Sequence, residues 1–96
     1  MVMTILEAHV SADQWAILEK AYNDETQQAL TPGIVQTYLA HSINDPGLWR
    51  ILTVWRSREV LDEMRKQGTP RGVVMFREAG AEPVLSIFDI AGGAGA

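Results

Sequence analysis

The chain has 96 residues, with 8 basic residues, 12 acidic residues, no cysteine and a net charge of -4. This length predicts one domain, and the acidic balance argues against a nucleic-acid partner, which would require a basic surface. The absence of cysteine excludes disulfides, thiolate metal sites and thiol nucleophiles. No apolar run approaches the ~20 residues that span a membrane, and residues 1–10 lack the features of a signal peptide. We therefore expect a cytoplasmic protein with no membrane partner.

The N-terminal part of the sequence predicts a strand followed by a helix. Apolar side chains occur at both parities of residues 2–10, which favours a strand. Ser11 is placed to cap the amide of Gln14, whose side chain reaches back in a capping box, and this predicts a helix start. One face of the helix carries side chains at spacings of three and four: Trp15, Leu18, Tyr22, Thr26 and Ala29. The Thr-Pro-Gly sequence at 31–33 ends the helix.

The C-terminal part predicts a hairpin, two helical segments and a last strand. Residues 34–42 and 48–56 form strands on either side of a turn that contains Asn, Asp, Pro and Gly. Ser57 is a candidate N-cap, and Glu59 in the first turn favours the helix dipole. A proline at a first helical position predicts a second helical segment over residues 70–79. Residues 83–90 predict the fourth strand.

The element order β-α-β-β-α-β predicts an α+β, ferredoxin-like fold with a four-stranded antiparallel sheet. Right-handed crossovers are expected to place the first and third strands in the centre, parallel to each other, and both helices on one face. This domain spans residues 1–90. Residues 91–96 contain only alanine and glycine and are expected to form a flexible tail.

The predicted sheet is apolar on both faces. Three of its strands, at residues 2–10, 48–56 and 83–90, carry apolar side chains at both parities, whereas a one-sided antiparallel sheet alternates apolar with polar residues. The helices cover one face, so the other would expose a patch of several hundred Å². We therefore expect a homodimer packed sheet to sheet. The alternative is a monomer with a loosely covered face.

The strand at residues 51–55 (Ile-Leu-Thr-Val-Trp) runs directly into the helix start at Ser57 and Glu59. With the chain length and element order, this junction resembles the antibiotic-biosynthesis-monooxygenase-like proteins over about residues 2–90. The resemblance implies a dimeric α/β-barrel fold with a pocket between the sheet and the helices. That superfamily includes cofactor-independent monooxygenases, haem-degrading enzymes, isomerases and proteins without an assigned activity, so the fold does not fix the function.

The resemblance also allows one branch of the family to be tested against this sequence. In the haem-degrading branch, an Asn on the first strand, a Trp in the second helix and a later His carry the chemistry. Here the matching first-strand residue is Ala8, the helix position falls near Met64, and no histidine follows His41. Haem degradation is therefore not expected. The polyketide-oxidising branch uses no metal or flavin, and the resemblance to it implies no cofactor here.

His9 and His41 are the only histidines of the chain. If the first and second strands run in opposite directions, these residues lie ~20 Å apart, too far to share a metal within one protomer. Glu7 and His9 share a strand face, but two ligands are too few for a closed site. No metal site is expected. Either histidine could transfer a proton near neutral pH or be an ordinary polar or interface residue.

Seven residues are candidates for a binding or catalytic site. The candidate catalytic residues offer hydrogen bonding or proton transfer and are Tyr22, Tyr38 and His41. The candidate substrate-binding residues are aromatic or cationic and are Trp49, Trp55, Arg71 and Phe76. Each has a structural alternative, because buried aromatic residues most often serve packing and an arginine is most often solvated. Trp49 has the further alternative of an interface position.

These residues and the family resemblance leave three functional hypotheses. The first is a cofactor-independent monooxygenase, which would oxidise a small aromatic, phenolic or polyketide-like substrate through a carbanion that reduces O2. The second is a non-catalytic dimeric α/β-barrel protein that binds a small ligand or has a stress-related role. The third, an isomerase of the muconolactone type, requires a positioned acid or base that the sequence does not identify.

Overall fold

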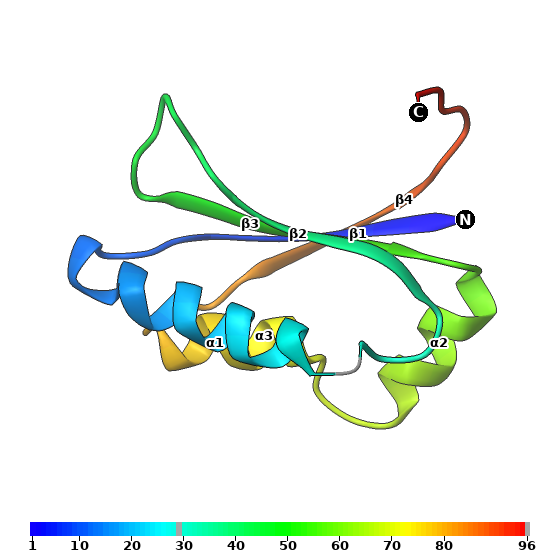
Figure 1. Cartoon of the computed structure of the whole chain (residues 1–96), viewed down its shortest axis with the longest axis horizontal. Coiled ribbons are helices and arrows are strands. Elements are labelled where there is room, and N and C mark those ends of the chain that lie inside the picture. The colour runs from blue at the N-terminus through cyan, green and yellow to red at the C-terminus, as the bar shows by residue number, and fades with distance from the viewer. Residues whose placement is uncertain (29, 96) are drawn as a thin grey trace.

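The computed structural model describes residues 1–28 and 30–95 and shows a four-stranded antiparallel sheet with helices on one face. The strands are β1 (Val2–His9), β2 (Ile34–His41), β3 (Leu48–Trp55) and β4 (Val84–Asp89). The helices are α1 (Trp15–Gln27), α2 (Arg58–Lys66) and α3 (Arg71–Glu78), with a short 3-10 turn, η1 (Ala12–Gln14), before α1. All three helices lie below the sheet in Figure 1. This is the predicted ferredoxin-like α+β fold.

The strand order is β2-β3-β1-β4, so the first and third strands are central as predicted. Their predicted parallel orientation is wrong, because β1 and β3 pair antiparallel, with Val2 opposite Trp55 and His9 opposite Leu48. The reason is topological. The α1 crossover makes β1 and β2 run in the same direction, and the β2–β3 hairpin then reverses β3 relative to both.

The helix starts differ in how they are capped. Ser57 accepts a hydrogen bond from the amide of Val60 at 3.2 Å, which confirms the N-cap predicted for α2. The predicted capping box at Ser11 is wrong, because its side chain makes no cap hydrogen bond. The chain instead turns through η1, and the Trp15 indole N–H donates to the carbonyl of Val10 at 2.8 Å. Ala29, predicted on the inner face of α1, lies outside the described residues.

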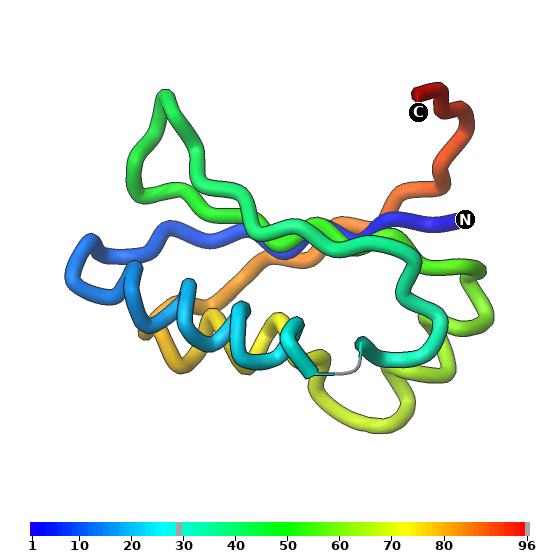
Figure 2. The backbone as a smooth tube through the Cα atoms, in the orientation of Figure 1, coloured from blue at the N-terminus to red at the C-terminus, as the bar shows by residue number. Residues whose placement is uncertain are grey.

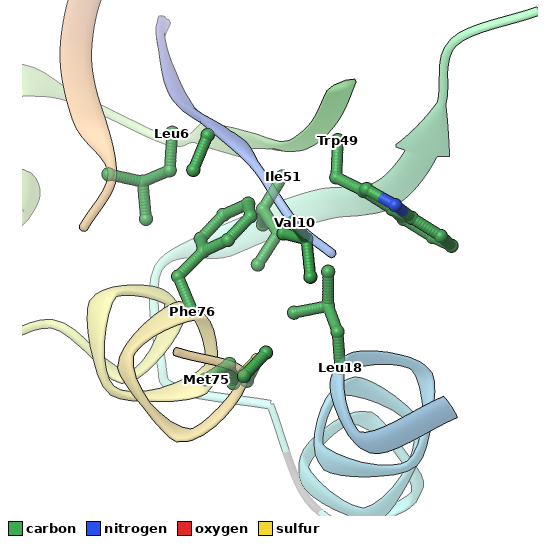
Figure 3. Close-up of a cluster of buried hydrophobic side chains, with 9 residues drawn as sticks. Leu6, Val10, Leu18, Trp49, Ile51, Met75 and Phe76 are labelled. Atoms are coloured by element: carbon green, nitrogen blue, oxygen red, sulfur yellow. The ribbon is translucent and has the colours of Figure 1, made fainter. Parts of the chain in front are cut away.

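Two apolar clusters fill most of the space between the sheet and the helices. The larger one joins β1 and β3 to α1 and α3, and Figure 3 shows Phe76 and Leu18 pointing from the helices toward the strands. Phe76 and Leu18 are both 0% exposed. The smaller cluster packs Val2 and Trp55 of the sheet against Leu61 of α2. The two clusters lie toward opposite ends of the sheet. The space between them is therefore where the protein could hold a ligand.

No helix among the described residues covers the second face of the sheet (Figure 1). Residues that alternate with the buried ones point to it, and several are exposed apolar side chains: Tyr38, Val84, Phe88 and Ile90. The tip of the β2–β3 hairpin and the C-terminal segment both bend toward this open face (Figure 2). Ile43, in that hairpin, is 95% exposed. Within the described residues, no helix has the length and hydrophobicity needed to cross a membrane.

Candidate functional site

A cavity of about 120 Å³ lies between the sheet and the three helices, in the space between the two apolar clusters. Its floor is the inner face of β1, β2 and β3, and its walls come from α1, α2 and α3. Most of the lining is apolar, including Leu6, Ile51, Leu61, Met64 and Met75. The lining includes exposed residues, namely Leu30, Arg65 and Arg71, so the cavity opens to solvent on their side. An apolar cavity with a few polar groups is the usual form of a small-molecule site.

The polar part of the floor is a row of three threonines that crosses the sheet. Thr53 of β3 is the cross-strand partner of Thr37 on β2 and of Thr4 on β1. Thr4 and Thr53 are buried, at 7% and 8% exposure. The hydroxyl oxygens of Thr37 and Thr53 are 3.3 Å apart and share a hydrogen bond. The cavity floor therefore carries three hydroxyl groups in a row, two of which are hydrogen-bonded to each other.

Two aromatic side chains hold the ends of this threonine row. The Tyr22 hydroxyl of α1 donates to the Thr37 hydroxyl at 3.3 Å. The Trp55 indole N–H donates to the Thr4 hydroxyl at 3.0 Å. Both aromatic residues line the cavity, so each contributes an apolar wall and also fixes a threonine beneath it.

The only described ion pair within the cavity lining joins Arg71, at the start of α3, to Glu25 of α1. This hydrogen bond, with the charge of the carboxylate, raises the pKa of Arg71 above its ordinary value. The Glu25 side chain is 33% exposed and that of Arg71 is 65% exposed, so the pair lies at the entrance. It places one carboxylate and one cation beside a largely apolar cavity.

The structure separates the residues predicted from the sequence. Tyr22, Trp55 and Arg71 line the cavity. Phe76 is fully buried in the larger cluster, and Trp49 is 3% exposed in the same cluster. Tyr38 is 54% exposed and projects from the open face, opposite Leu52. The cavity therefore brings together three of the seven candidates, and Phe76, Trp49 and Tyr38 lie outside it.

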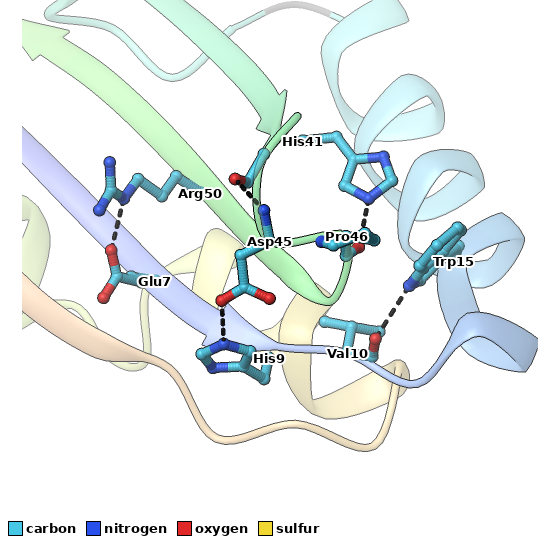
Figure 4. Close-up of polar contacts among 9 residues, drawn as sticks. Glu7, His9, Val10, Trp15, His41, Asp45, Pro46 and Arg50 are labelled. Atoms are coloured by element: carbon cyan, nitrogen blue, oxygen red, sulfur yellow. Dashed lines mark hydrogen bonds and ion pairs between the residues drawn. The ribbon is translucent and has the colours of Figure 1, made fainter.

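His41, the seventh candidate, belongs to an aromatic group at the hairpin end of the sheet. Its ring stacks on Trp49 with centroids 3.9 Å apart and meets the edge of Trp15 at 4.6 Å. Its Nε2 contacts the carbonyl of Pro46 (Figure 4). The buried Trp49 indole N–H has no hydrogen-bond partner among the described residues. His41 does not line the cavity.

The predicted separation of the two histidines is wrong, because β1 and β2 run in the same direction. His9 and His41 lie at the same end of the sheet with β3 between them, which corresponds to about 10 Å. His9 instead contacts the Asp45 carboxylate at 2.8 Å, as Figure 4 shows. Among residues 1–28 and 30–95, no group of three or more His, Cys, Asp or Glu side chains is placed to hold a metal.

The residues that sequence reasoning missed are Thr4, Thr37, Thr53 and Glu25. A threonine in a strand is common because β-branched residues favour strands, so no single threonine stands out. The available signal was that Thr4 and Thr53 each share the parity of buried apolar neighbours, Leu6 and Ile51. A polar residue on an apolar strand face indicates a buried hydroxyl with a hydrogen-bond partner.

Comparison with solved structures places this fold among small α+β proteins with the same architecture. A candidate antibiotic biosynthesis monooxygenase from Deinococcus radiodurans aligns with 12% identity and a TM-score of 0.75, covering 100% of this chain and 98% of that one. A corresponding protein from Caulobacter crescentus aligns with 20% identity and a TM-score of 0.70, covering 95% and 91%. A MhuD variant with two manganese protoporphyrin IX molecules bound per active site aligns with 18% identity and a TM-score of 0.75, covering 100% of both chains. At these identities the comparisons show the fold alone.

The family follows from the sequence itself. Residues 1–69 match the antibiotic biosynthesis monooxygenase family, and this match spans most of the chain. No curated protein sequence matches the chain. The protein therefore belongs to the antibiotic biosynthesis monooxygenase family, as the strand–helix junction at residues 51–59 indicated.

Proposed function

We propose that the protein is a cofactor-independent monooxygenase that oxidises a small phenolic substrate held in the cavity. The keto tautomer of the phenol, in which the hydroxyl proton has moved to a ring carbon, carries a ring CH2 group. In the reaction this group loses a proton, the resulting carbanion passes electrons to O2, and the products are a quinone with one new ring carbonyl and water. Both C–H bonds break, one oxygen atom enters the carbonyl, and the other leaves as water. The observation that carries the proposal is the apolar cavity with a hydroxyl floor and one carboxylate at its entrance, in a chain of this family.

The size of the cavity supports a small substrate. Its volume, about 120 Å³, is below the roughly 300–1,000 Å³ typical of sites for drug-sized ligands. An engineered apolar cavity of about 150 Å³ in another protein accepts benzene. A single aromatic ring is therefore the unit that fits inside, and any further substituent would extend through the entrance.

The lining residues suggest separate roles for the apolar and polar groups. Trp55 and the aliphatic side chains exclude water from the ring, which strengthens every polar contact inside. Glu25 is the only carboxylate among the described lining residues, so it is the group that would accept the proton from the ring carbon. Arg71, paired with it, would hold the carboxylate at the entrance and attract an anionic substrate.

The cavity lining does not fit a porphyrin. No histidine lies among the described residues that line it, and the Asn, Trp and His positions of the haem-degrading branch are not matched in this chain. Haem chemistry is therefore not part of the proposal.

The direct test of the activity is incubation of the purified, chelator-treated protein with a panel of small hydroxylated aromatic compounds under oxygen-18 gas. The proposal predicts O2 consumption, a carbonyl product that carries one heavy oxygen atom, and no dependence on added metal or flavin. Tight binding of ring compounds without any turnover would contradict it. That result would favour the second candidate function, a non-catalytic ligand-binding protein, for which the specific observation is that Glu25 is already paired with Arg71.

We also propose that the protein is a homodimer that packs open face to open face. The supporting observations are the apolar side chains on the open face and the hairpin and C-terminal segment that bend toward it (Figure 1). A contiguous apolar face that extends across four strands is typical of a protein–protein interaction site. A second copy of the same surface would cover it with matched shape.

Replacing Ile5 with glutamate is expected to convert the dimer to a folded monomer. Ile5 lies on β1 between Leu52 and Ser86 at the centre of the open face, where two symmetry-related charges would be buried without partners. The measurement is molar mass by light scattering at several concentrations, with circular dichroism to confirm the fold. Ile17→Glu, an isoleucine on α1 at 43% exposure, is the matched control. A wild-type chain that is monomeric at all concentrations would refute the proposed dimer.

A further inference from the structure

We propose that Thr4 and Thr53 form a two-donor site that binds one oxygen atom of the ligand at the cavity floor. The inference rests on the proposed use of the cavity as a ligand site, and it adds the chemistry by which the ligand is recognised. It assigns the ligand an oxygen acceptor, such as a phenolate, enolate or carbonyl oxygen, at the end of the ring that enters first.

The first donor follows from counting protons in the hydroxyl chain. Tyr22, Thr37 and Thr53 carry three hydroxyl protons, and the structure shows two hydrogen bonds among them. Tyr22 donates to Thr37. Either hydroxyl can be the donor between Thr37 and Thr53, and we assign Thr37 as the donor because hydrogen bonds that run in one direction along a chain strengthen one another. The Thr53 hydroxyl proton then has no acceptor among the described contacts, although Thr53 is 8% exposed.

The second donor is the Thr4 hydroxyl. Its oxygen accepts the indole N–H of Trp55 at 3.0 Å, and this contact uses a lone pair rather than the hydroxyl proton. The Thr4 hydroxyl proton also has no described acceptor, and Thr4 is 7% exposed. A buried donor without a partner is unfavourable, so both hydroxyls are poised to donate to an acceptor that enters the cavity.

The two hydroxyls are placed to share one acceptor. Thr4 and Thr53 are directly opposite on adjacent antiparallel strands and point to the same face, which sets their Cβ atoms about 4.5–5.5 Å apart. An oxygen between them can lie within the ~2.7–2.8 Å of an ordinary O–H···O hydrogen bond to each. Both residues line the cavity, so the shared position lies inside it.

The surroundings select an oxygen that gains negative charge. The neighbouring lining residues Leu6 and Ile51 are apolar, and donors in such surroundings act more strongly than in water. Two fixed hydroxyl donors would stabilise the oxyanion that forms when a phenolic ring becomes a carbanion or enolate. With its oxygen at Thr4 and Thr53, the ring would present its opposite end to Glu25 at the entrance.

The test compares phenol with toluene, two single-ring probes of similar size that carry a hydroxyl group and a methyl group respectively. Binding of each is measured by calorimetry to the wild-type chain and to Thr53→Val, which keeps the shape and strand preference of the side chain but removes the hydroxyl. We expect the phenol affinity to fall by about five- to thirtyfold and the toluene affinity to stay within about twofold. Thr53→Ser should restore phenol binding. Thr69 is exposed and lies outside the cavity, so Thr69→Val should change neither the phenol affinity nor the toluene affinity.

Three results would overturn the inference: equal losses for phenol and toluene, no loss for either, or a wild-type chain that does not prefer phenol. Because no oxidation is measured, the outcome is independent of turnover. If the protein binds phenol through Thr53 but oxidises no substrate, the monooxygenase proposal is refuted and the inference about Thr4 and Thr53 is supported. If instead the losses for phenol and toluene are equal while Thr53→Val still oxidises phenols, the activity is retained and the assigned recognition is removed.

Discussion

A hundredfold or greater fall in kcat is the expected result of replacing Glu25 with glutamine. Glutamine keeps the size of the side chain and an oxygen that can accept from Arg71, but it cannot take a proton from the substrate. Removing a general base typically costs about 10²- to 10⁴-fold. The measurement is the initial rate of O2 consumption at saturating substrate, which separates a loss of chemistry from a loss of binding.

Glu82→Gln is the matched control for this variant. Glu82 pairs with Arg77 of α3 at 2.8 Å, as Glu25 pairs with Arg71 of the same helix, but Glu82 is outside the cavity lining. The control should retain the wild-type kcat. Equal activity of Glu25→Gln and the wild-type chain would remove Glu25 from the mechanism, and a rise in KM without a change in kcat would assign it to binding alone.

Replacing Phe76 with alanine is expected to lower the free energy of unfolding by about 3–5 kcal/mol. Phe76 is 0% exposed and packs within the larger cluster between α3 and the sheet, so truncation leaves a cavity that neighbouring side chains cannot fill. The free energy of unfolding of a natural protein is about 5–15 kcal/mol, so the variant would lose a large part of its stability. Denaturant unfolding followed by circular dichroism measures the change.

The Phe76 variant also decides between two interpretations of that residue. The sequence predicted Phe76 as a substrate contact, whereas the structure places it in the core beside the cavity. A substrate contact at the edge of a pocket would lose ligand affinity with a stability loss below about 1 kcal/mol. Phe76→Leu, which keeps most of the buried volume, should recover most of the stability if the residue is part of the core.

The fold could be predicted because its signals are local. The apolar pattern of residues 2–10, the Asn-Asp-Pro-Gly turn at 44–47 and the Ser57 cap each act within a few residues of the chain. The orientation of β1 relative to β3 could not be obtained that way. It depends on which strands the crossover joins, and the error there carried over directly into the predicted separation of His9 and His41.

The site was less predictable because it depends on register. β2 contains an irregularity between Ile34 and Gln36, so Ile34 and Thr37 point to the same side although their parities differ. Strict alternation from Ile34 would put Tyr38 toward the helices and Thr37 on the open face, the reverse of what the structure shows. A single extra residue in β2 therefore places Tyr38 on the open face and Thr37 in the threonine row.

The most direct test of the account is a titration of the nitrogen-15-labelled chain with phenol, followed at the three tryptophan indole N–H signals. These groups differ in environment: Trp55 donates to Thr4 at the cavity floor, Trp15 donates to Val10, and buried Trp49 has no described partner. If phenol occupies the cavity, the Trp55 signal should shift with saturation while those of Trp15 and Trp49 stay in place. A shift confined to Trp15 and Trp49, or no shift at Trp55 when phenol binds, would contradict the account.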